Sequence, residues 1–210
     1  MKLEVSQTYN GTSGDLTLTL SSLSAPLSSL VIDAQQCDGV AVTVAAPPSE
    51  CGGGASVTCV VSVSATAPSA ASPSLKVSYD VGLEQKSFSV DLPSVVTKFL
   101  SPLSLEKDAF DEKSNECGMS LGEVVLCSFM WRDAEKIKGM LSGGLNMGMI
   151  ESNDDMSFLA AASFPGAEGE VECLLNLQNI DEGTYLLDIR SHNDALKSGV
   201  ERVVKAILTS

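Results

Sequence analysis

Short runs of alternating apolar and polar residues, separated by turn residues, fill the first 92 residues of the chain. Alternation with a period of two directs every second side chain toward a core, so these runs predict half-buried β-strands. Asn10 and Gly11 stand between the first two runs and favour a tight hairpin, because both residue types tolerate positive φ. About seven such strands with regular turns between them are typical of an immunoglobulin-like β-sandwich.

After Pro102 the pattern becomes a mixture of helical and strand segments. The last segment, 193–208, is predicted to be an amphipathic helix. Its apolar face consists of Leu196, Val200, Val203 or Val204, and Ile207. Further helices are predicted over 104–116 and 132–144, and strands over 122–131, 145–152, 156–164, 170–178 and 184–191. The sequence therefore predicts two subdomains: an immunoglobulin-like β-sandwich over residues 1–100, and an α+β subdomain over 101–210 with a sheet flanked by helices.

The boundary between these parts carries an unusual pattern. Apolar and polar residues alternate from Phe88 to Leu92, and Pro93 then interrupts the strand. The run Val95–Leu100 is denser in apolar residues and stops before Pro102. It is too apolar for an exposed linker. We expect either a last strand of the sandwich or a strand that belongs to both halves and fastens them together.

Charge narrows the classes of partner. The chain has 13 basic and 27 acidic residues, a formal net charge of −14 and a pI near 4.3. Binding to nucleic acid or to anionic lipid needs clustered Lys and Arg, so neither is expected. No apolar run approaches the roughly 20 residues that a membrane span requires, so direct membrane insertion is not expected. The opening MKLEVSQTYN lacks the apolar segment of a signal peptide, and we expect a cytosolic protein.

The six cysteines form no CxxC motif and have no zinc-finger spacing with histidine. Buried thiols that pack as small apolar groups are the favoured interpretation. The alternative is a secreted module with disulfides, which an even number of cysteines permits.

Catalytic patterns are lacking in the sequence. The chain has one histidine, His192, and no nucleophile motif accompanies it. The acidic pairs at 153–155 and 181–182 lie in turn-like segments and are expected to be solvated. We therefore expect no enzymatic activity, no cofactor and no metal, and a binding module is the remaining class.

One long stretch resembles a known family. The segment LKVSYDVGLEQKSFSVDLPSVVTKFLSPLSLEKDAF, residues 75–110, is similar to the junction in the appendage (ear) of the α-adaptin subunit of the plasma-membrane clathrin adaptor complex. The later stretch EVECLLNLQNIDEGTYLLDIRS also resembles strands of that ear, and a C-terminal helix follows in both. The resemblance covers roughly residues 70–210, while the first 70 residues match only in strand pattern.

The resemblance implies a fold and a function. The fold is an immunoglobulin-like sandwich followed by an α+β platform. The ear recruits accessory endocytic proteins by binding short linear motifs of the Asp-Pro-Phe or Asp-x-Phe type, without catalysis. It belongs to a longer chain whose trunk associates with the other adaptor subunits. Its place would be the cytoplasm, peripheral on the plasma membrane at clathrin-coated pits.

The resemblance also implies a peptide site on the platform. In the family, an aromatic pair and a Trp on the first platform helix form part of the pocket. In this chain the first aromatic position is Ala109, the second is Phe110, and the Trp position falls at Lys113. An aromatic anchor for the ligand would be lost, and such anchors supply much of the energy of a small interface.

Basic residues on two late strands complete the pocket in the family. The first of these positions is Asn176, the second is Leu186, and the third, Arg190, is kept. We therefore expect an altered or weakened platform specificity. The alternative is that Trp131, Lys113 or Arg132 supplies an equivalent pocket.

Three other classes remain open at this point. The ear of another coat subunit, of the β-adaptin or coatomer γ type, shares the two-part architecture. A secreted immunoglobulin-like module would differ by having disulfides. An enzyme would need a cluster of acidic groups with perturbed pKa values in a deep pocket.

Overall fold

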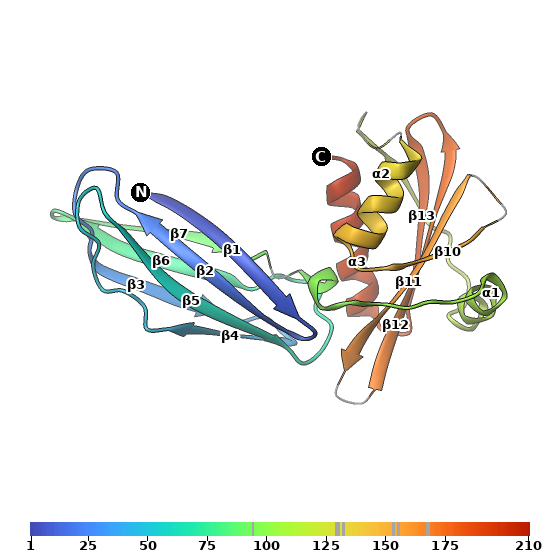
Figure 1. The fold of residues 1–210 in the computed structure, drawn as a ribbon, viewed down its shortest axis with the longest axis horizontal. Helices are drawn as coiled ribbons and strands as arrows, with labels where there is room; N and C mark the ends of the chain where they lie inside the picture. The colour runs from blue at the N-terminus through green and yellow to red at the C-terminus, as the bar shows by residue number, and fades with distance from the viewer. Residues whose placement is uncertain (94, 129–130, 132, 153, 155, 167–168) are drawn as a thin grey trace. The chain divides into compact units, whose positions relative to one another are not determined.

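The computed structural model describes residues 1–93, 95–128, 131, 133–152, 154, 156–166 and 169–210. The chain is mostly β-strand with a few helices (Figure 1), as the alternation predicts. It divides into two compact units, one made of Met1–Ala67 and Ala71–Ser94, the other of Pro68–Ala70 and Val95–Ser210.

Seven strands in two antiparallel sheets make up the first unit (Figure 1). The four-stranded sheet has the order β1 (Lys2–Asn10), β2 (Ser13–Ser21), β5 (Ser56–Ala65), β4 (Val40–Ala45). The three-stranded sheet has the order β3 (Ser28–Gln35), β6 (Ser74–Val81), β7 (Glu84–Asp91).

Alternation along β2 shows why these segments are strands. Leu16, Leu18 and Leu20 are fully buried, while the residues between them face outward. Complete burial of such a side chain stabilises the fold by about 1.5–3 kcal/mol. A shift of the β2 register by one residue would turn all three leucines toward solvent and lose this stabilisation. The predicted β1–β2 hairpin is confirmed, with Asn10 opposite Ser13 and Gly11 at a φ of 58°.

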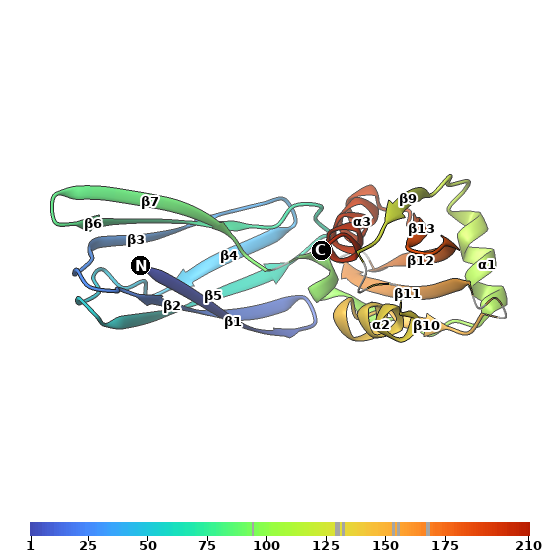
Figure 2. The ribbon, with the colours of Figure 1, turned by 90° about the horizontal axis from the view of Figure 1, so that it is seen from above.

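The second unit is built on an antiparallel sheet of six strands. The order is β10 (Gly148–Ile150), β11 (Ser157–Gly166), β12 (Gly169–Asp181), β13 (Thr184–Arg190), β9 (Glu123–Leu126), and the short β8 (Ser101–Pro102) also pairs with β11. Figure 2 shows α2 (Ala134–Gly139) and α3 (Asp194–Leu208) on one face of this sheet and α1 (Lys107–Glu116) on the other.

Helix α3 begins where its sequence predicts. The Asn193 side chain accepts a hydrogen bond from the Leu196 N–H over 2.9 Å and thereby caps the helix. The buried row continues through residues four apart, so Val204 and Leu208 are buried, whereas Val203 and Ile207 are only partly covered. The inclusion of Ile207 in the apolar face is therefore corrected to Leu208.

The prediction of a strand over Val95–Leu100 is wrong. Val96–Phe99 forms a 3-10 helix of the second unit, and the Lys98 N–H donates to the Val95 carbonyl over 2.9 Å. Val96 packs against α3, where a Cβ on Gly199 would come within 2.8 Å of its Cγ1. A run without alternation buries residues all round one helical turn, and the glycine allows this turn to approach the helix closely.

Candidate functional site

The five residues of the predicted peptide site lie on the α1 face of the second sheet. Asn176 on β12 is directly opposite Asp188 on β13. Leu186 and Arg190 are each two residues from Asp188, so all three share one face. Leu174, two residues before Asn176, packs against Phe110 of α1 and identifies this face as the one that α1 covers.

Phe110 belongs to the core of this face. Only 4% of its surface is exposed, and it packs with Ile150, Leu159, Ala161 and Leu174. Its ring therefore fixes α1 on the sheet and presents almost no surface to a ligand. The sequence pattern places Phe110 on the apolar side of α1. Only the packing shows that the sheet covers this side and leaves no room for a ligand at Phe110.

Lys113 is engaged across the face. Its ammonium lies 2.7 Å from a carboxylate oxygen of Glu172 on β12. This hydrogen bond holds the pKa of Lys113 above its usual value. A peptide carboxylate would have to compete with Glu172 for the same ammonium.

Arg190 is also used within the fold. Its guanidinium donates to the Asp188 carboxylate over 2.8 Å and to the carbonyl oxygens of Ser114 and Gly118 over 2.8 and 3.2 Å. The last two acceptors belong to the end of α1 and the turn after it, where helix carbonyls lack partners. Arg190 thus ties the C-terminal end of α1 to β13.

Asn176 and Asp188 leave two acceptors without donors. The Oδ1 atoms of both side chains are buried and have no hydrogen-bond partner in the part of the chain that the structure describes. A buried polar atom left unpaired costs about 1–3 kcal/mol. A ligand with N–H or O–H donors would therefore suit the centre of this face better than a ligand that brings further carboxylates.

Leu186 makes the α1 face apolar where β13 lies next to β9. It is half-buried, and a Cβ on Gly122 would come within 3.0 Å of its Cγ, so glycine at that position makes room for the leucine. Its cross-strand partner on β9 is Val124, which is exposed. The resemblance leads us to expect a cation at position 186, and the chain has an apolar side chain there.

The remaining candidates lie elsewhere. Ala109 is half-buried on α1 beside Phe110. The carbonyl of Trp131 accepts from the Tyr185 hydroxyl over 3.3 Å, and Tyr185 alternates with Leu186, so it belongs to the opposite face. Trp131 therefore does not replace the missing aromatic residue on the α1 face. Arg132 lies outside the described residues.

The sequence pattern does not reveal the distant partners that bind Lys113 and Arg190. Glu172 meets Lys113 across 59 positions, and the carbonyl of Ser114 meets Arg190 across 76. No spacing rule connects residues so far apart. The alternation of β12 and β13 could have placed Asp188 and Arg190 on one face, since they are two residues apart on a predicted strand.

A thiol and the imidazole come together beside this face. Cys117 Sγ lies 3.8 Å from His192 Nε2, which resembles a nucleophile–base pair in its residue types. Burial, however, raises the pKa of the Cys117 thiol and so disfavours the thiolate that nucleophilic attack requires. The arrangement offers a weak polar contact more readily than catalysis.

No disulfide joins any of the six cysteines, all of which the structure describes. Burial raises the pKa of Cys173 to about 12.

We expect a thiol titration in denaturant, without reductant, to find six thiols. We also expect Cys173 to resist iodoacetamide at about pH 8 until the protein unfolds, because the thiolate fraction of Cys173 is negligible at that pH. Mass spectrometry of the labelled peptides measures both. Fewer than six thiols would favour the disulfide-containing alternative, and rapid native labelling of Cys173 would contradict its burial.

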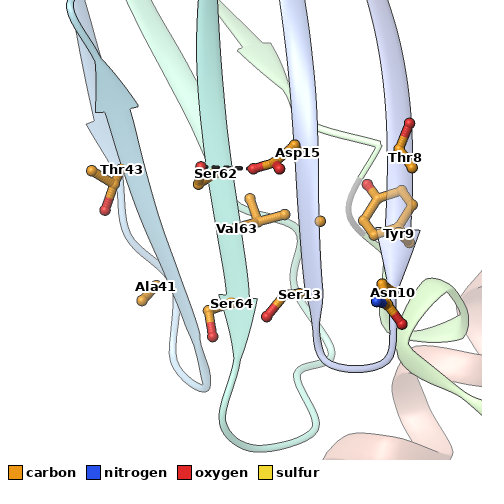
Figure 3. Close-up of a pocket in the computed structure, with 11 residues that line it drawn as sticks. Thr8, Tyr9, Asn10, Ser13, Asp15, Ala41, Thr43, Ser62, Val63 and Ser64 are labelled. Carbon is orange, nitrogen blue, oxygen red and sulfur yellow. Dashed lines mark hydrogen bonds between the residues drawn. The ribbon is translucent and has the colours of Figure 1, made fainter.

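The first unit has a shallow hollow of about 510 Å³ (Figure 3). Small polar side chains line most of it, and the Ser62 hydroxyl donates to Asp15 over 2.7 Å. Tyr9 lies over Gly14, where a Cβ would overlap its ring. With its one carboxylate already bonded and no cation among the lining residues, the hollow provides hydroxyl groups but no catalytic arrangement.

No family model matches the chain, and no curated protein matches it. Among the helices that the structure describes, none combines the length and apolar character needed to cross a membrane.

Proposed function

We propose that this chain is the appendage of a clathrin-adaptor α subunit, which recruits accessory endocytic proteins by binding short peptide segments. The observation that carries the proposal is the place of the segment that resembles the family. Its strand part is β7, which ends at Asp91, and its VVTKF part opens the main segment of the second unit at Val95. A junction motif belongs at such a boundary.

The proposed fold is an immunoglobulin-like sandwich followed by an α+β platform. The strand orders β1-β2-β5-β4 and β3-β6-β7 support the sandwich, because they correspond to the ABED and CFG sheets of constant-type immunoglobulin domains. The antiparallel second sheet, with α1 on one face and α2 and α3 on the other, supports the platform.

The proposed peptide site is the α1 face, with an altered specificity. Phe110 is buried, Lys113 and Arg190 are already ion-paired, and Asn176 and Leu186 carry no charge. An acidic motif would meet few available cations, and the net charge of −14 would repel it at low salt. In the proposal the protein works without catalysis or cofactor, in the cytoplasm at clathrin-coated pits, and its trunk contacts the other adaptor subunits.

Restoring one cation tests this site. We expect Leu186→Arg to bind an Asp-Pro-Phe or Asp-x-Phe peptide about tenfold more tightly than the unmodified protein, a gain of about 1.4 kcal/mol from a charge-assisted hydrogen bond. Isothermal titration calorimetry measures both affinities. Leu186→Gln is the matched control, because it adds a polar side chain at the same position without the charge.

The altered specificity is ruled out if the unmodified protein already binds these peptides as tightly as Leu186→Arg does. The placement of the site on the α1 face is ruled out if the arginine and glutamine variants bind alike, since the peptide would then not use this face.

A further inference from the structure

Strand β9 forms one edge of the second sheet. The strand order runs from β10 to β9, and among the strands that the structure describes β9 pairs with β13 alone. Figure 2 shows β9 and β10 at opposite edges. An edge strand presents backbone N–H and C=O groups that another chain can pair with.

The register shows which backbone groups of β9 are available. The Cys127 N–H donates to the Gly183 carbonyl over 2.9 Å, directly after the pair Leu126–Thr184. Bonded and non-bonded pairs alternate along an antiparallel ladder, so Val125 is bonded to β13, whereas Val124 and Leu126 are not. The N–H and C=O groups of Val124 and Leu126 therefore point outward, and in the described part of the chain they have no partner.

The side chains of the same two residues are apolar and exposed. Val124 is 59% exposed and Leu126 73% exposed, both on the face that carries Leu186. Their neighbours on β9 point to the other face, where Val125 is buried and Glu123 is paired with Lys205. Exposed positions of an edge strand are ordinarily polar or charged, and the positions of Val124 and Leu126 lack this protection.

We propose that β9 binds an extended segment of a partner protein, which adds a strand to the sheet antiparallel to β9. Every strand pair in this sheet is antiparallel. Partner residues opposite Val124 and Leu126 exchange main-chain hydrogen bonds with them and share their face, so these partner residues are apolar. The inference requires neither membership of the adaptor family nor a ligand on the α1 face.

Charge determines the rest of the segment. Residues 102–210 contain 19 acidic and 9 basic side chains, and the whole chain carries −14. The field of the protein attracts a basic segment and repels an acidic one. The partner segment is therefore one in which apolar residues alternate with basic residues. A second copy of this chain, equally acidic, is disfavoured by the same field.

Amide hydrogen exchange tests the pairing residue by residue. The probe is a capped seven-residue peptide of alternating lysine and valine, added to ¹⁵N-labelled protein. In the free protein, the amides of Val124 and Leu126 are expected to exchange quickly and that of Val125 slowly. With peptide, exchange at Val124 and Leu126 is expected to slow at least tenfold while Val125 stays unchanged, which makes Val125 the internal control.

Modified peptides separate backbone pairing from side-chain contact. N-methylation of the valine amides is expected to weaken binding at least tenfold, since these amides face β9, and N-methylation of the lysine amides is expected to leave it nearly unchanged. A peptide of alternating glutamate and valine is expected to bind more weakly, most clearly at low salt.

A variant of the strand completes the test. Val124→Pro removes an outward N–H without breaking a bond to β13, so it is expected to weaken binding at least tenfold and to leave the exchange of Val125 unchanged. Val124→Thr retains the N–H and is the matched control, with binding reduced much less.

Three results would overturn the inference. The first is no slowing at Val124 and Leu126 with about 1 mM peptide, which is the scale of a very weak interaction. The second is equal binding of both methylated peptides. The third is protection of Val124 and Leu126 in the free protein that rises with its concentration together with a dimeric mass, which would assign the edge to a second copy.

Discussion

Replacing Phe110 by alanine is expected to lower the free energy of unfolding of the second unit by about 3–5 kcal/mol. The ring is 4% exposed and fills the space between α1 and the residues Ile150, Leu159 and Leu174. Truncation removes this buried surface and leaves a cavity that the rigid sheet can close only in part. Urea unfolding followed by the fluorescence of Trp131, the one tryptophan of the chain, reports on this unit.

Met119→Ala is the control for this prediction. Met119 follows α1 and is 99% exposed, so its truncation is expected to change the unfolding free energy by less than about 0.5 kcal/mol. If Phe110→Ala instead left unfolding unchanged and abolished peptide binding, the ring would be a ligand contact, contrary to its position in the core.

Arg190→Met is expected to destabilise the second unit by about 2–3 kcal/mol, measured by the same urea unfolding. The change removes the hydrogen bonds to the carbonyls of Ser114 and Gly118 and leaves the Asp188 carboxylate, which is 13% exposed, without its cation. A solvated arginine that only awaited a ligand would cost far less.

A double variant tests whether the unpaired Asp188 carboxylate causes the destabilisation by Arg190→Met. Arg190→Met combined with Asp188→Leu removes the carboxylate together with its partner, so no uncompensated charge remains in the sheet face. We expect the double variant to recover at least half of the loss, which is a coupling between the two sites. If the unfolding free-energy changes of the two single variants simply added in the double variant, the ion pair between Arg190 and Asp188 would not account for the destabilisation.

Much of the fold could be predicted from local pattern. The Asn10-Gly11 hairpin, the buried row of leucines in β2 and the Asn193 cap of α3 depend on neighbours within a few residues. The helix predicted over 132–144 is also present, with α2 followed by a π-helical turn over Met140–Gly144. These elements are governed by chain geometry and by a period that the sequence displays.

The candidate site was only partly predictable. The resemblance and the strand period place Asn176, Leu186 and Arg190 on one face, and the structure does so as well. Neither indicates that Arg190 is bonded to the end of α1, or that Val124 and Leu126 stand exposed on an edge. An apolar strand residue has the same sequence pattern whether a neighbouring element covers it or not.

Val95–Leu100 shows the limit most clearly. The sequence by itself determined that this run is buried, because it is dense in apolar residues and lies between two prolines. Only the tertiary structure decided that it is a 3-10 turn packed on α3, since that choice depends on Gly199, about a hundred residues later, which allows the close approach. Local periodicity therefore specified most of the strands and helices of this protein, while contacts between distant residues decided the form of Val95–Leu100, which side chains are engaged within the fold and which are left available for binding.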